Sequence, residues 1–230
     1  MSRPTLKISP LQWLYCLTAL FFTVKVWLLP NPSLDYPGVD IVQSIVLDSG
    51  VPNAVTGIIF RNRLYDTIFE VLVFTIAIMG VSYLMANEKP LGQVEQFSDQ
   101  PSIVLARLGA TITALVSIEL AIRGHLSPGG GFAAGVAGGT AIGLVAITAS
   151  TTWMEQLYQR WQIGTWEKVS VLVFIVLAGL TFGGWELAQG EFGALVSGGM
   201  IPILNALVAF KVALGSWAAI LIFIRYRGLL

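Results

Sequence analysis

The sequence predicts an all-α integral membrane protein with about six transmembrane helices, and three observations support this prediction. Of the 230 residues, 55% are hydrophobic and only 11% are charged, whereas ordinary soluble domains carry about 25% charged residues. The apolar residues gather in stretches of about 20, the length that crosses a bilayer core of about 30 Å. The 13 basic and 13 acidic residues balance, and the absence of a basic run argues against nucleic-acid binding. A soluble domain and a disordered chain are therefore excluded.

Six apolar stretches are the expected spans. They cover residues 11–29, 64–85, 102–124, 132–150, 169–188 and 203–224. The first contains Lys25 and lacks a small-x-small cleavage site, so we expect a mature helix and not a secretory signal. The apolar stretch 51–60 is too short to span and predicts an interfacial or re-entrant helix that begins at Pro52. Residues 153–168 are expected to form an amphipathic cytoplasmic linker.

Basic residues near the ends of the expected spans predict the orientation of the chain. With six spans, one side receives Arg3, Lys7, Lys89, Arg160, Lys168, Arg225 and Arg227. Cytoplasmic loops are rich in lysine and arginine, so both termini are expected in the cytoplasm.

Only one cysteine, Cys16, is present. It excludes an internal disulfide and a cysteine-ligated zinc or iron–sulfur site supplied by this chain alone. We therefore expect no cofactor and no redox or hydrolytic site in this chain.

Ionisable residues inside the spans are the candidate functional residues, because each is costly in a bilayer unless it meets a partner or water. Asp66 and Glu70 lie four residues apart on one helix face and are candidates to hold a cation or a proton. Alternatively, Asp66 only caps the helix start near Arg61 and Arg63.

Glu119 and Arg123 share a face of the third span and can pair within the helix. The only histidine, His125, follows them and is either a proton relay or a polar loop residue.

Lys211 lies near the middle of the sixth span, too deep to reach the interface without strain. It needs a carboxylate partner, and the expected candidates are Glu119, Glu186 or a carboxylate of a neighbouring subunit. Glu186 lies near the end of the fifth span, beside Gly183 and Gly184.

Glycine is concentrated between the third and fourth spans. The loop HLSPGGGF, which begins at His125, matches neither the Walker pattern nor the dinucleotide-binding pattern. Beyond it, four glycines recur at intervals of four residues: Gly131, Gly135, Gly139 and Gly143. They leave one smooth helix face, which predicts a closely docked helix from this chain or from a partner.

These motifs resemble a known family. The stretch GHLSPGGGF with the glycine-rich helix (124–143) resembles the MnhB/MrpB subunits of multisubunit Mrp-type cation/proton antiporters, and IPILNALVAFKVALG (201–215) resembles their final helix, in its hydrogenase-like variant. The stretch NAVTGIIFRNRLYDTIFEV (53–71) resembles the MrpA C-terminal tail, which also occurs as the separate hydrogenase subunit MbhE, although Leu64 replaces the usual glycine.

The resemblance implies two fused modules: an MbhE-like two-helix module at 1–86, a polar linker at 87–100, and an MnhB-like four-helix module at 101–230. It implies partner subunits in an assembly related to the membrane arm of respiratory complex I, in a prokaryotic plasma membrane or an internal energy-transducing membrane. It further implies a sodium path near the small subunits, which makes Asp66 and Glu70 the candidate Na⁺ site.

Three functions remain open at this point. The first is an ion-path subunit of a Na⁺/H⁺ antiporter, with Asp66, Glu70, Glu119, Arg123, Glu186 and Lys211 on or beside the path. The second is a structural subunit whose glycines and charges dock neighbouring subunits. The third is a subunit of a redox-driven pump, such as a membrane-bound hydrogenase or an NADH-dehydrogenase-like complex.

Overall fold

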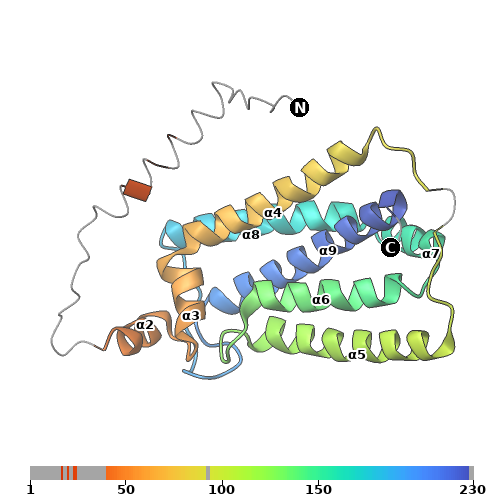
Figure 1. The fold of residues 1–230 in the computed structure, drawn as a ribbon. Helices are drawn as coiled ribbons and strands as arrows, with labels where there is room; N and C mark the ends of the chain where they lie inside the picture. The colour runs from red at the N-terminus through yellow and green to blue at the C-terminus, as the bar shows by residue number, and fades with distance from the viewer. Residues whose placement is uncertain (1–16, 18–19, 21–22, 25–39, 92–93, 228–230) are drawn as a thin grey trace. The chain divides into compact units, whose positions relative to one another are not determined.

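The computed structural model describes residues 17, 20, 23, 24, 40–91 and 94–227 (Figure 1). The expected span 11–29, with Lys25, lies largely outside the described residues. From Asp40 onward the chain forms one compact unit, and this unit contains every helix discussed below.

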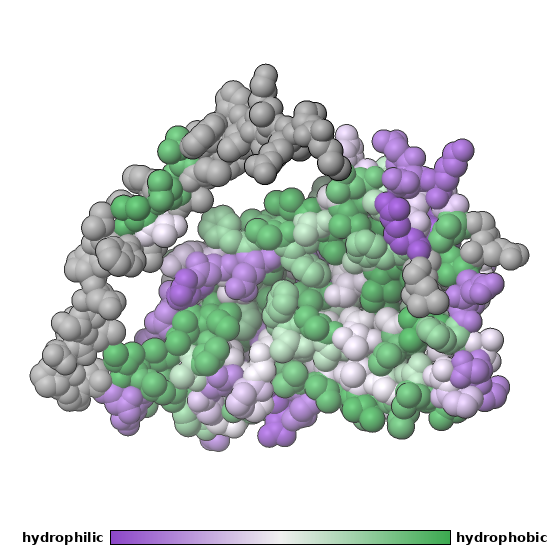
Figure 2. All heavy atoms as spheres, in the orientation of Figure 1, coloured by the Kyte–Doolittle hydropathy of each residue, from purple (hydrophilic) through white to green (hydrophobic). Residues whose placement is uncertain are grey.

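Four helices of this unit are long and apolar enough to cross a membrane. They are α4 (Leu64–Met85), α5 (Gln100–Arg123), α8 (Ile163–Phe182) and α9 (Ile201–Arg227). A fifth apolar helix, α6 (Gly130–Ala146), is shorter. Among the described residues, hydrophobic side chains cover much of the visible face, and hydrophilic ones gather toward its two ends (Figure 2). The all-α membrane class and the second, third and sixth expected spans are confirmed.

Helix α9 is the centre of the unit, because it packs against α4, α5, α6, α7 and α8. In the most apolar 18-residue stretch of α9, 56% of the residues are buried, against 6% in that of α4 and 11% in that of α5. Apolar side chains of α4, α8 and α9 form one buried cluster, and those of α6, α7 and α9 form another. Residues on α9 therefore lie deepest in the protein.

The fifth expected span begins six residues too late. Helix α8 covers Ile163–Phe182 and not 169–188, and it ends where Gly184 adopts a positive φ of 82°. The linker expected at 153–168 is instead α7 (Thr151–Arg160), a short turn, and the first turns of α8. The fourth span also ends early, at Ala146, because Ser150 already caps α7 by accepting a hydrogen bond from the Trp153 amide.

Three short helices lie at the end of the unit opposite α7 (Figure 1). Helix α2 (Ile41–Ser49) was not predicted, and it is capped by Asp40 and ended by Gly50 in the left-handed region. Helix α3 (Ala54–Gly57) begins at the Asn53 cap and continues into the π-helix η1 (Ile58–Asn62). The expected short helix near 51–60 is thus present as α3 and η1.

Candidate functional site

Lys211 is a buried cation in the central helix. It lies ten residues into α9, about 15 Å along the helix axis. Its side chain is only 1% exposed. A buried ammonium group without compensation is strongly unfavourable, so its surroundings decide whether the charge is tolerated.

The carboxylate facing Lys211 belongs to Glu167 on α8. Nζ of Lys211 lies 3.9 Å from Oε1 of Glu167, whose side chain is 8% exposed. This separation lies within the range of an ion pair but is too long for a hydrogen bond. Neither of these two atoms has a hydrogen-bond partner among the described residues. Within this chain, the partner of Lys211 is therefore neither Glu119 nor Glu186.

Phe74 of α4 and Gly215 of α9 complete the surroundings of the pair. Nζ of Lys211 lies 3.9 Å from the centre of the Phe74 ring, close enough for a cation–π interaction. A Cβ atom at Gly215 would lie 2.6 Å from the Phe74 ring and 3.3 Å from Oε1 of Glu167. The glycine thus makes room for both groups, and three helices meet at the pair.

Glu167 was missed in the sequence because the expected start of the fifth span fell two residues after it. A signal was nevertheless present in the helical spacing. Glu167 lies four, seven and eleven residues before Val171, Phe174 and Ala178, which are all buried. Extending that apolar face toward the N-terminus puts Glu167 on the buried side of the helix.

The remaining acidic candidates lie apart from this pair. Asp66 forms an ion pair with Arg63, and the Glu70 side chain is exposed on α4. Glu119 pairs with Arg123 at 3.3 Å, as the spacing predicted, but both side chains are more than half exposed. Among the described residues, no group of three histidine, cysteine or acidic side chains could hold a metal ion. A sodium site near Asp66 and Glu70 stays a prediction.

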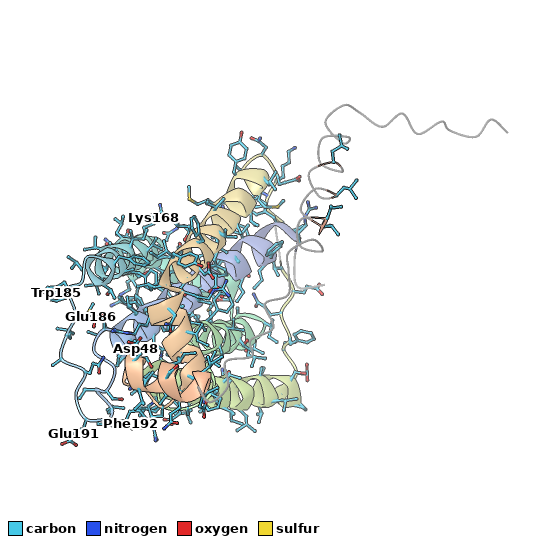
Figure 3. All side chains as sticks on the ribbon, turned by 90° about the vertical axis from the view of Figure 1, so that its left-hand side faces the viewer. Asp48, Lys168, Trp185, Glu186, Glu191 and Phe192 are labelled. Carbon is cyan, nitrogen blue, oxygen red and sulfur yellow. The ribbon has the colours of Figure 1, made fainter. Side chains whose placement is uncertain are left out.

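Glu186 lies outside the spans, in the connection that follows α8. Nη1 of Arg61 donates a hydrogen bond of 2.8 Å to Glu186, and Nε donates one of 2.9 Å to Asp48. Figure 3 shows Asp48 and Glu186 near each other, with Glu191 and Phe192 farther out on the same connection. The hydrogen bond to Glu186 and other contacts with the two carboxylates raise the pKa of Arg61. Arg61 therefore ties α2 and η1 to the α8–α9 connection. Glu186 lies four residues beyond the end of α8, whereas the expected fifth span, 169–188, included it.

His125 lies in the loop between α5 and α6 and is fully buried. Its ring nitrogens face the backbone of Ala194 and Leu195, but neither forms a well-aligned hydrogen bond with a described residue. Burial lowers its pKa, and those two backbone contacts only partly offset the effect. The ring is therefore neutral at pH 7. A role as a proton relay stays a prediction.

The expected glycine face on α6 packs against α9 of the same chain. An added Cβ would lie 2.3 Å from Asn205 O at Gly131, 2.4 Å from Val212 Cβ at Gly135 and 2.5 Å from Ser216 Cβ at Gly139. At Gly143 the nearest atom would be 3.4 Å away. The predicted close helix contact is confirmed, and the helix is α9 and not a partner's.

Comparisons with known proteins fit this geometry. The family model described as a domain related to the MnhB subunit of Na⁺/H⁺ antiporters matches residues 101–218, which is just over half of the chain. A probable K⁺/H⁺ antiporter A/B subunit of Rhizobium meliloti is 23% identical over 90% of this chain, but the chain spans only 23% of that relative. An uncharacterized protein of Methanocaldococcus jannaschii is 28% identical over 75% of this chain and 77% of its own length.

Two solved structures share the fold. A chain of the membrane-bound sulfane sulfur reductase, an archaeal respiratory membrane complex, matches with a TM-score of 0.65 and 24% identity over 93% of this chain and 98% of its own. A chain of the Mrp complex of Dietzia sp. matches with a TM-score of 0.56 and 19% identity over 99% of this chain and 27% of its own. Together with the family match, the apolar spans show that this is an integral membrane protein that belongs to the MnhB-related family.

Proposed function

We propose that this protein is a membrane subunit of an Mrp-type Na⁺/H⁺ antiporter, or of a related respiratory complex, and that its Lys211–Glu167 pair takes part in proton movement. The observation that carries this proposal is the buried pair itself, with Nζ and Oε1 3.9 Å apart and without hydrogen bonds to described residues. A purely structural buried pair is expected to satisfy its hydrogen bonds, since an unsatisfied charge is costly.

The geometry of the pair suits a group that changes its protonation state. Each charge stabilises the other in a poorly screened interior. A proton that Glu167 gains or Lys211 loses would therefore change the energy of the charge that remains. Neither side chain is fixed by a short hydrogen bond, so a small rotamer change can bring the two groups together or separate them.

The other charged candidates are proposed to act at the edges of this chain. Asp66 and Glu70 on α4 are proposed to contact a sodium ion, or a neighbouring subunit that holds the sodium path. Glu119 and Arg123 project outward from α5 and would face a neighbouring protein or water. His125 remains a candidate relay only if loop movement exposes its ring.

The names of the relatives favour this assignment of partners. One relative is a probable K⁺/H⁺ antiporter A/B subunit, and the solved structures come from an Mrp complex and from a respiratory membrane complex. The alignment with that A/B subunit covers 90% of this chain, beyond the family match at 101–218. We propose on this basis that residues 1–86 and 101–230 are the fused tail and MnhB-like modules.

The test is to replace each member of the pair in the assembled host complex. Glu167→Gln and Lys211→Met should each remove most Na⁺-dependent proton movement in inverted membrane vesicles, measured with a pH-sensitive dye. Lys89→Met is the control, because Lys89 is an exposed lysine beyond the end of α4. Native gel electrophoresis must show normal assembly for every variant. Wild-type exchange by assembled Glu167→Gln and Lys211→Met complexes would refute the role of the pair.

A second candidate function is a docking subunit without ion chemistry. The close packing of Gly139 against α9 favours it, because this face is a structural feature independent of the charges. In that case Gly139→Leu should abolish assembly while the charge substitutions are silent. Purifying the tagged complex and recording its visible absorbance then separates an antiporter from a redox-driven assembly with iron–sulfur clusters.

A further inference from the structure

A groove leads toward Glu167 from one end of the unit. It lies between α4, α7, α8 and α9 and has a volume of about 770 Å³. Glu167 lines the groove together with Ala218 of α9 and Ser82 of α4, and Glu155 and Arg225 line it as well. From Ala218 to Arg225 the groove follows α9 for seven residues, or about 10 Å. Arg225 is near the end of α9, where α7 also lies (Figure 1).

The carboxylate lies at the deep end of this groove. A Cβ atom at Gly215 would lie 3.3 Å from Oε1 of Glu167, so the carboxylate rests against α9 about one turn before Ala218. Oε1 has no hydrogen-bond partner among the described residues. Oε1 is also shielded from solvent, so water in the groove donates a hydrogen bond to it only after the Glu167 side chain rotates.

Polar side chains line the groove between Glu167 and its outer end. The hydroxyls of Tyr158 and Ser82, the Lys168 ammonium and the Glu155 carboxylate all border it. Burial and the charge of Glu167 together raise the pKa of Tyr158, so the phenol and the carboxylate interact electrostatically. Arg225 and Glu155 lie 3.7 Å apart and are partly exposed, which places an ion pair where the groove opens. Water in a groove needs such polar partners.

The opposite side of the pair is packed with apolar side chains. Val71 of α4, Val171 and Phe174 of α8, and Val208 and Val212 of α9 are each at most 6% exposed and belong to one cluster. Val212 follows Lys211 directly, and Val208 lies almost one turn away from it, toward the α2 end. These side chains offer water no hydrogen bonds, and closely packed apolar interiors stay dry.

We infer that the Glu167–Lys211 pair exchanges protons with water only at the α7 end of the protein, through this groove. A proton from water in the groove binds a carboxylate oxygen of Glu167 and neutralises it, and the reverse step returns the proton to the same water. Lys211 lies against the same carboxylate, and its positive charge stabilises the ionised form of Glu167. The inference rests on the proposed function of the pair and adds the side from which it is reached.

Cysteine labelling in vesicles that hold the whole complex tests this route. Both probes are made in a Cys16→Ser background. Ala218→Cys probes the groove, and Val208→Cys, on the same helix, probes the apolar cluster on the opposite side of the pair. A membrane-impermeant, positively charged thiosulfonate is added to inverted and to right-side-out vesicles. A tag after Leu230 reports which vesicles expose the end of α9.

We expect Ala218→Cys to react at least about tenfold faster than Val208→Cys, because only the thiolate reacts and apolar surroundings suppress it. The reaction should occur only in the vesicles that expose the tag. Modified Ala218→Cys should lose the exchange activity of the complex, because the added cation blocks the groove. Ser82→Cys on α4 should behave in the same way, and this second variant keeps the test valid if the Ala218 substitution disturbs the local packing.

Two results would overturn the inference. One is labelling of Val208→Cys from the side opposite the tag at a rate similar to that of Ala218→Cys. The other is an inert cysteine at both 218 and 82. In either case a loss of exchange in Glu167→Gln would keep the proposed function while rejecting the route. Conversely, labelling from the tag side with normal exchange in Glu167→Gln would reject the function of the pair, and the groove would be only a hydrated surface.

Discussion

Glu167 and Lys211 depend on each other, because each is a buried charge that the other compensates. Removing one partner of a buried pair leaves an uncompensated charge, which typically costs about 3–5 kcal/mol. Replacing both partners by apolar groups of similar size is often close to neutral. The pair therefore predicts a strongly non-additive mutational cycle.

We expect Glu167→Leu to lower the free energy of unfolding by about 3 kcal/mol or more, since Lys211 then has no counter-charge. Combining it with Lys211→Met should recover more than half of that loss. Thermal unfolding in detergent, followed by tryptophan fluorescence, measures both effects. Lys89→Met serves as the exposed control. If the losses of the two single variants simply add in the double variant, the two charges do not interact as argued.

His125 predicts a second effect, on the dependence of stability on pH. Its pKa is lowered by burial, whereas a histidine in the unfolded chain has a pKa of about 6.5. As the pH falls below about 6.5, the unfolded chain binds a proton that the folded chain does not, so folding becomes less favourable. The loss should grow until the lowered pKa of the folded state is reached, and His125 should cause no loss above about pH 6.5.

The measurement compares the unfolding midpoints of the wild type and of His125→Gln across the acidic range. As the pH falls from 7.5 to below 6.5, the unfolding midpoint of the wild type should fall more than that of the variant, because the variant lacks this titrating group. Parallel curves for the two proteins would show that folding does not lower the pKa of His125. The single histidine of the chain makes this comparison clean.

How far residues could be assigned from sequence differs between the two members of the pair. Lys211 was found because a lysine in the middle of an apolar stretch has no other simple explanation. Glu167 was missed because it lies among polar and aromatic residues that read as a linker, and only the tertiary packing shows that this turn is inside the bundle. Asp66 and Glu119 were correctly placed on their helices, but the local sequence says nothing of which helix faces are buried.

At the scale of elements, the contact between α6 and α9 makes the sharpest prediction. Gly139→Ala adds a Cβ that would lie 2.5 Å from Cβ of Ser216, which forces the two helices apart. Overpacking of this kind costs about 1–3 kcal/mol. Gly80→Ala on α4 is the matched control, because a Cβ there meets nothing within 4 Å and a helical Gly→Ala change is otherwise favourable by about 0.5–1 kcal/mol.

We therefore expect opposite signs: a lower unfolding temperature for Gly139→Ala and an unchanged or higher one for Gly80→Ala. Both variants are measured in the same detergent. Equal shifts for the two variants would mean that the glycines act through backbone flexibility and not through close packing.

The spans illustrate what patterns can and cannot predict. Helix α4 matches its expected bounds because polar residues flank its apolar stretch on both sides, and α9 matches closely because glycines precede its apolar stretch and arginines follow it. The bounds of α8 were displaced because Trp166, Glu167 and Lys168 look interfacial, while the glycines at 183 and 184 look compatible with a continuing helix. The direction in which the glycine face of α6 points was also open, since the repeat predicts a partner helix but not which one.

At the scale of the whole molecule, the buried and exposed helices suggest where neighbours lie. Helix α9 is central, whereas most residues in the apolar stretches of α4 and α5 are not buried. Glu70 is an exposed carboxylate in the seventh position of α4, about 9 Å from the helix start. A carboxylate at that depth is costly against lipid tails. We therefore expect this face of α4 to be covered by another protein of the assembled complex.

Photo-crosslinking tests this expectation, with benzoylphenylalanine placed at Val73, which is 64% exposed and lies three residues from Glu70. The matched control is Val176 on α8, which is 59% exposed and has no charged residue within one turn. In membranes that hold the complex, the probe at Val73 should crosslink to another protein of the complex, whereas the probe at Val176 should yield mainly lipid adducts. An adduct of the Val73 probe with lipid alone would contradict the covered face. An adduct with this chain's own residues 1–39 would also contradict it, because the cover would then not be a partner.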